Sequence, residues 1–138
     1  MRLLVKLSVL CLLLSGISSC KSVFNLVCQP WKIEEVKFNP GTAVLTPEQL
    51  RSIEHQLKND FVFRFHPDSV YVVIKQYDTI YGKWWLNDDK KKIISVVQGT
   101  PEQVSEIVKI NRKEFLFHPL QDLGSIQYIR CTPATDKK

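Results

Sequence analysis

The chain has 138 residues, a formal net charge of +5 and 44% hydrophobic residues. This length is enough for one small domain with a core of its own, but not for two. The basic excess is too small and too dispersed for a nucleic-acid-binding protein, so we expect no nucleic acid partner.

The first residues have the pattern of an exported lipoprotein. Residues 1–6 form a basic start, and residues 7–14 are almost wholly apolar but too few to span a bilayer, which takes about 20 residues. Ile17-Ser18-Ser19-Cys20 then resembles the lipobox of bacterial lipoproteins. We therefore expect a lipoprotein signal peptide over residues 1–19, and acyl chains on Cys20 that anchor the protein in a membrane. An ordinary signal peptide cut elsewhere is the alternative.

The residues after Cys20 bear on the location of this anchor. Lys21 follows directly, so no Asp is there to favour retention in an inner membrane, and residues 22–25 carry no acidic pair that would resemble a surface-export signal. We expect a lipid-anchored protein of the bacterial cell envelope, in the outer membrane and facing the periplasm. Surface exposure stays open.

Two thiols remain in the mature domain, on Cys28 and Cys131. An even pair in an exported protein is more often a disulfide than a catalytic or metal site. We therefore predict a Cys28–Cys131 disulfide, which requires the two ends of the folded segment to meet.

Beyond a tether over residues 20–29, short strands alternate with turns. In the first strand, residues 31–38, the apolar positions change phase at Glu34-Glu35, which predicts a bulge. Thr46-Pro47-Glu48-Gln49 then has the pattern of a helix start, and the apolar stripe that follows predicts a helix to about residue 57. The other strands are predicted at 61–66, 70–77, 81–87, 92–98, 103–110, 113–118 and 125–131.

Eight short strands joined mostly by short turns favour an all-β, antiparallel, up-and-down barrel with one short helix after the first strand. The barrel domain is predicted over residues 30–131, with a polar tail over residues 132–138. A two-sheet β-sandwich is the alternative.

A family resemblance rests on a few aromatic positions in this order of elements. The Trp-led first strand, the helix, the Phe-rich hairpin and Gly82-Lys83-Trp84-Trp85 resemble the small lipocalin-like, or calycin-like, lipoproteins of Bacteroidetes-type bacteria. The resemblance implies a lipocalin-like barrel with a general capacity for apolar ligands. It also implies that Trp31 plugs the closed end and that Arg130 stacks on it. The usual Gly-x-Trp is absent, because Gln29-Pro30 precedes Trp31.

No catalytic constellation occurs in the sequence. There is no nucleophile elbow, phosphate loop or HExxH motif, and the adjacent pairs Glu34-Glu35 and Asp88-Asp89 are poorly placed to share a proton. We expect no enzymatic activity and no cofactor.

The aromatic side chains are the candidates for a ligand cavity. On each strand only one face points inward, so Trp84 and Trp85 must point to opposite sides. The residues expected to line a cavity, or simply to fill the barrel, are Phe61, Phe63, Phe65, Trp84, Phe115 and Phe117, with Tyr71 and Tyr77 as further candidates.

Two similar pentapeptides, FRFHP at residues 63–67 and FLFHP at 115–119, raise the question of a paired histidine site. In an up-and-down barrel the second and seventh strands end at opposite rims, which separates His66 and His118 by roughly 15–20 Å. We therefore expect no metal site there, only inward Phe pairs followed by a strand-ending proline.

Three functions are compatible with this sequence. The first is binding of a small apolar ligand, either a lipid or a haem-like molecule, by a membrane-anchored lipocalin-like lipoprotein. The second is a structural or accessory subunit that docks on another envelope protein, and the third is an inhibitor of an envelope-directed enzyme. An open interior would favour the first, and a filled interior with an exposed apolar patch would favour the second.

Overall fold

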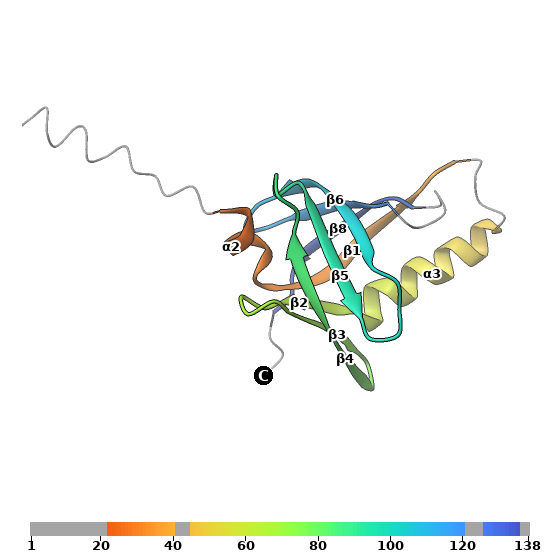
Figure 1. The fold of residues 1–138 in the computed structure, drawn as a ribbon. Coiled ribbons are helices and arrows are strands. Elements are labelled where there is room, and N and C mark those ends of the chain that lie inside the picture. The colour runs from red at the N-terminus through yellow and green to blue at the C-terminus, as the bar shows by residue number, and fades with distance from the viewer. Residues whose placement is uncertain (1–21, 41–44, 121–125, 136–138) are drawn as a thin grey trace, which may run out of the picture.

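The computed structural model describes residues 22–40, 45–120 and 126–135, and these form a closed eight-stranded barrel (Figure 1). Each strand pairs antiparallel with the next strand in the chain, and the last pairs with the first, so the fold is the predicted up-and-down barrel and not a sandwich. The strands are β1 (Pro30–Phe38), β2 (Val62–Phe65), β3 (Val70–Lys75), β4 (Asp78–Leu86), β5 (Lys92–Val97), β6 (Gln103–Ile110), β7 (Phe115–Pro119) and β8 (Ile126–Pro133).

Strand β1 contains the predicted bulge. Its register with β8 shifts between Ile33 and Glu35, where one extra residue interrupts the pairing. Because of this shift, Ile33 before the bulge and Val36 after it are both buried, 2% and 4% exposed. The bulge therefore keeps the apolar side chains of β1 on the inside of the barrel.

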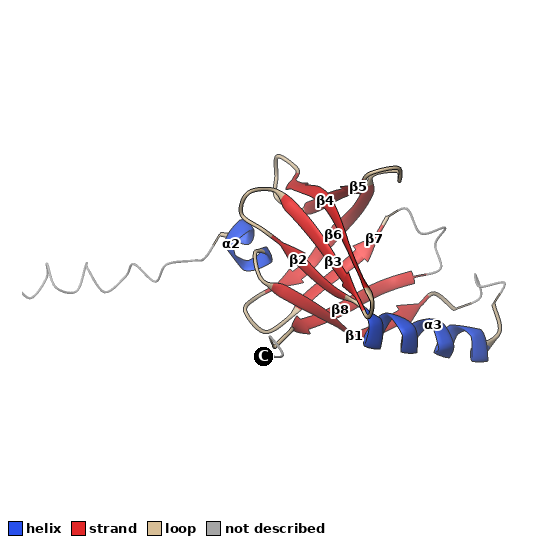
Figure 2. Cartoon of the chain, turned by 90° about the horizontal axis from the view of Figure 1, so that it is seen from below, coloured by secondary structure: helices blue, strands red, loops and turns tan. Residues whose placement is uncertain are grey.

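The predicted helix is α3 (Pro47–Asp60), which joins β1 to β2. Its start is a capping box, in which Thr46 Oγ1 accepts from the Gln49 amide at 3.3 Å and Gln49 Oε1 accepts from the Thr46 amide at 2.8 Å. None of its side chains is fully buried, but α3 packs on β1, and Leu57 contacts the core (Figure 2).

A second helix, α2 (Val23–Val27), lies within the segment expected to be a tether. Ser22 caps it by accepting the Asn25 amide at 3.3 Å, and its last residue, Val27, is fully buried. The two views show α2 at the end of the barrel opposite α3 (Figures 1 and 2). Neither helix in these described ranges is long and apolar enough to cross a membrane.

The strand order shows at which end of the barrel each of five turns lies. Because β1 starts beside α2 and neighbouring strands are antiparallel, the turns β2–β3, β4–β5 and β6–β7 lie at the α2 end. The turns β3–β4 and β5–β6 lie at the other end. We call the α2 end the closed end and the opposite end the mouth.

Candidate ligand cavity in the barrel

The barrel encloses a cavity of about 380 Å³. Residues from the β5–β6 turn and from the end of β7 line it, including Thr100 and Pro119, so it reaches the mouth. Most of the lining is apolar: Trp31, Ile33, Leu57, Phe63, Phe65, Val73, Ile93, Val97, Phe115, Phe117, Ile126 and Ile129.

Four of the six predicted aromatics line this cavity, namely Phe63, Phe65, Phe115 and Phe117. Phe61 does not. It is the C-cap residue that follows α3, and it lies in an outer groove with Lys75 Nζ 5.5 Å from its ring centroid.

Trp84 closes the barrel instead of lining the cavity. It is 1% exposed, stacks on Phe24 of α2 at 5.3 Å between ring centroids, and donates its Nε1–H to the carbonyl oxygen of His66 at 2.8 Å. Trp85 is 40% exposed, as alternation predicts. Tyr77 is 92% exposed and takes no part in the cavity.

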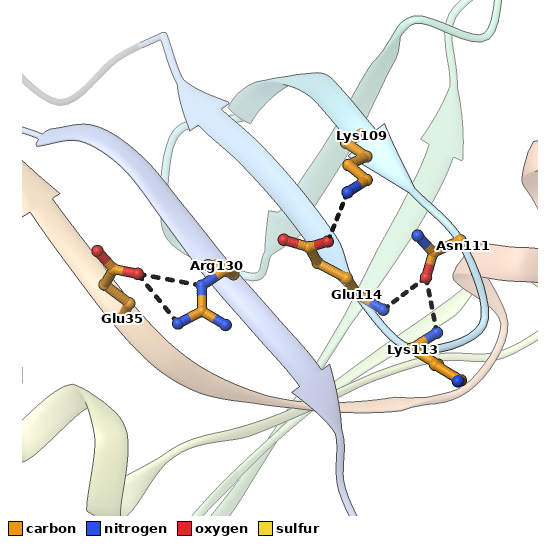
Figure 3. Close-up of polar contacts among 6 residues, drawn as sticks. All are labelled: Glu35, Lys109, Asn111, Lys113, Glu114 and Arg130. Carbon is orange, nitrogen blue, oxygen red and sulfur yellow. Dashed lines mark hydrogen bonds and ion pairs between the residues drawn. The ribbon is translucent and has the colours of Figure 1, made fainter.

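Trp31 lies at the closed end, but the stack with Arg130 expected from the family resemblance is not formed. Trp31 is fully buried, donates its Nε1–H to the carbonyl oxygen of Val27 at 3.1 Å and packs on Phe115 at 5.5 Å between ring centroids. Arg130 instead forms a 3.0 Å ion pair with Glu35 on the outer surface (Figure 3). Strand alternation explains this outcome, since both neighbours of Arg130 on β8 line the cavity.

The predicted disulfide is also not formed, because Cys28 and Cys131 are both free thiols. The register pairs Cys131 with Ile33, three residues into β1, which is about 10 Å from Pro30 along the strand. The α-carbons of a disulfide lie about 4.4–6.8 Å apart. Cys131 is thus deeper in the barrel than the start of β1, and it lines the cavity.

The described lining residues include polar groups but no ionised side chain. Burial raises the pKa of the Cys131 thiol to about 12, and burial together with the nearby Cys131 raises the pKa of Tyr71, so both stay protonated at neutral pH. Across the described residues, no protein group hydrogen-bonds the Tyr71 hydroxyl. Ser95, Gln103 and Ser105 add a polar strip on neighbouring strands, where Ser95 lies opposite Gln103.

Ser95, Gln103, Ser105 and the inward thiol were missed as lining residues from sequence. A signal existed for β5, where Ile93, Ser95 and Val97 alternate onto one face. Strand β4 contributes no residue to the cavity lining, because Gly82 has no side chain and Trp84 lies at the closed end. The sequence did not indicate the position of Trp84.

The histidines of the two pentapeptides are not brought together. Strands β2 and β7 run in opposite directions, so His66 follows β2 at the closed end and His118 lies near the mouth. His118 Nδ1 is 2.7 Å from the carbonyl oxygen of Gln127. Within the described ranges, no group of three or more His, Cys, Asp and Glu residues is placed to hold a metal ion.

The fold and the cavity define a class, namely small closed β-barrels with an apolar interior that opens at one end. Comparisons with protein-family models, with curated proteins and with solved structures found no match.

Proposed function

We propose that this protein is a lipid-anchored binding protein of the bacterial cell envelope, which holds one small, uncharged, largely apolar molecule in its barrel. The observation that carries the proposal is the cavity of about 380 Å³. This volume is near the lower end of the range of about 300–1,000 Å³ for small-molecule sites. A purely structural barrel of this size would be filled by its own side chains.

The lining favours an uncharged ligand. Moving an ionised group from water into an apolar cavity is costly without a partner charge, and none of the described residues that line the cavity is Asp, Glu, Lys, Arg or His. The protonated Tyr71 hydroxyl supplies a hydrogen-bond donor. A lipid-like alcohol, ether or ester fits these groups better than a haem-like ligand, because no histidine is among the described lining residues and burial keeps the possible iron ligands Cys131 and Tyr71 protonated.

Displacement of the neutral dye N-phenyl-1-naphthylamine tests the binding. We expect 1-dodecanol to displace it at least tenfold better than dodecanoate or dodecylamine. Ser95→Phe, which puts a ring into the cavity, should weaken dye binding at least tenfold, whereas Ile94→Phe on the outer face of the same strand should not. If the dye does not bind the folded protein, or binds both variants equally, the cavity is not a ligand site.

Tyr71→Phe tests the hydrogen bond. A single neutral hydrogen bond contributes about 0.5–1.5 kcal/mol, so the variant should bind 1-dodecanol roughly 2- to 13-fold more weakly. The affinity for 1-chlorododecane, which lacks a hydroxyl, should be nearly unchanged. Equal loss for both compounds would mean that Tyr71 contributes packing only.

A docking role is the second candidate, because Tyr81 and Trp85 point outward on β4 and are 66% and 40% exposed. If it is correct, one larger envelope protein co-purifies with the wild-type chain and is lost from the double variant Tyr81→Ser/Trp85→Ser. Ligand binding would be unaffected in that variant.

The lipid anchor is proposed from sequence, because residues 1–21 lie outside the described residues. The intact mass of protein purified from membranes should show acyl chains on Cys20, and Cys20→Ala should release the protein into the soluble fraction. An unmodified Cys20 would refute the anchor and leave the cavity proposal standing.

A further inference from the structure

Only a short segment connects the proposed anchor at Cys20 to the closed end of the barrel. Cys20 precedes Ser22 by two residues, and Ser22 already caps α2. Two extended residues reach at most about 7 Å. Helix α2 is fixed to the barrel by the Phe24–Trp84 stack and by the buried Val27. An acylated Cys20 would therefore hold the closed end within a few ångströms of the lipid headgroups.

The same end carries exposed positive charge. Its turns and their flanks contribute five exposed cationic side chains, Lys90, Lys91, Lys92, Arg112 and Lys113. The exposed acidic side chains there are Asp68, Asp88 and Asp89, together with Glu106 opposite Lys92 on β6. Among the described residues none of the five cations forms an ion pair; the neighbouring Lys109 is paired with Glu114 at 2.9 Å (Figure 3).

Two of these acidic side chains accept hydrogen bonds from backbone amides. Asp68 accepts the Val70 amide at 3.2 Å, and Asp89 accepts the Lys91 amide at 3.0 Å. The described turns at the mouth and their flanks have a small excess of negative charge, from Asp78 and Glu102 against Lys75.

From these two independent features we propose that the closed end of the barrel rests on an anionic lipid surface, with the cavity mouth facing away from the membrane. The proposal rests on the lipid anchor of the proposed function. Lysine and arginine side chains within a Debye length of anionic lipid are attracted to it, and this second contact adds to the acyl chains. The ligand then exchanges with the aqueous side or with a partner there, and not directly with the anchoring bilayer.

Lysine footprinting on the wild-type chain tests this orientation. The acylated protein is reconstituted in phosphatidylcholine vesicles with 30% phosphatidylglycerol, and a membrane-impermeant amine reagent is applied from outside. The soluble Cys20→Ala chain serves as the reference. We expect Lys90, Lys91, Lys92 and Lys113 to react at least threefold more slowly on vesicles, while Lys58 and Lys75 react at the same rate in both samples.

A charge variant separates the lipid contact from the anchor. Lys90→Gln/Lys91→Gln/Lys92→Gln should reduce the protection at Lys113, whereas the control Lys58→Gln/Lys75→Gln should leave it unchanged. Uniform protection, or protection of Lys58 and Lys75 alone, would overturn the orientation, as would an unmodified Cys20. Dye displacement on the same samples reports the cavity independently, so failure of the orientation and failure of ligand binding are distinguishable.

Discussion

The ring of Phe24 in α2 stacks on the indole of Trp84 in β4, with ring centroids 5.3 Å apart and an interplanar angle of 20°. A five-residue helix has no appreciable stability alone, so α2 exists because of this packing and the burial of Val27. The helix converts one end of the barrel into a closed end.

Phe24→Ala should therefore destabilise the whole barrel. Fully buried Phe→Ala changes cost about 3–5 kcal/mol, and for the half-buried Phe24 we expect about 2 kcal/mol in urea unfolding. Asn25→Ala, at the exposed neighbouring position, should change the free energy of unfolding by less than about 0.5 kcal/mol. Equal effects of the two changes would show that α2 is not docked.

Gly82→Ala should also be destabilising. A Cβ at Gly82 would clash with the carbonyl oxygen of Val96 on the paired strand, so the backbone would have to move to accommodate it. We expect a loss of about 1–3 kcal/mol, the usual range for overpacking. Lys83→Ala on the outer face of the same strand is the control in the same urea titration. A Gly82→Ala variant as stable as the wild type would contradict the close approach of Val96 to Gly82.

Arg130 and Trp31 should differ sharply in their contribution to stability. Arg130→Gln removes a surface ion pair with Glu35 and should lower the free energy of unfolding only slightly, with the difference shrinking at high salt. Trp31→Ala removes a fully buried side chain and should cost about 3–5 kcal/mol. A cost for Arg130→Gln close to that of Trp31→Ala would support the indole stack that the structure lacks.

Both thiols should be alkylated after unfolding without reductant. In the native protein both should react slowly, because burial raises the pKa of Cys28 and of Cys131 and thiolate is the reactive form. The buried Cys131 should be slower than Cys28. Mass spectrometry of the alkylated chain checks this, and a chain that resists alkylation until reduced would contain the disulfide.

Stability should fall at alkaline pH. The pKa of Cys131 is raised from 9.0 in the ordinary thiol to about 12 in the fold, so the unfolded chain loses its proton first. The contribution of Cys131 to the free energy of unfolding is complete below pH 9. It declines as the pH rises toward 12, by up to about 1.4 kcal/mol per pH unit. Tyr71, whose pKa is also raised, should steepen the decline above pH 10.

Urea midpoints at pH 8, 9.5 and 10.5 measure this dependence. Cys131→Ala should show a shallower decline than the wild type between pH 9 and 10.5. An identical slope in the variant would assign the alkaline loss to other groups.

Local sequence rules predicted most of the barrel. The period-two alternation located every strand of the described ranges, and the phase change at Glu34-Glu35 located the bulge. The Thr46–Gln49 capping box located the start of α3. Helix α2 was missed, because five residues are too few to show a helical period and because Trp84, on which its Phe24 stacks, is sixty positions further along the chain.

The candidate site was predicted only in part, for a related reason. Alternation states that two side chains share a face, but not which face turns inward or how deep each residue lies. Arg130 is an example. It lies on the last strand, where the stack on Trp31 was expected, but its side chain is on the outer face of that strand and pairs with Glu35.

The strands, the turns, the bulge and the capped helix could be predicted from the sequence, because they depend on contacts between residues close in the chain. The fold was needed to show that Phe61 and Trp84 lie outside the cavity, that Cys28 and Cys131 stay apart, and that the interior is open, with no charged residue in its described lining. These features depend on the register with which distant strands close the barrel. A shift of a single pairing position would turn the side chains of a strand to its other face without altering the local pattern.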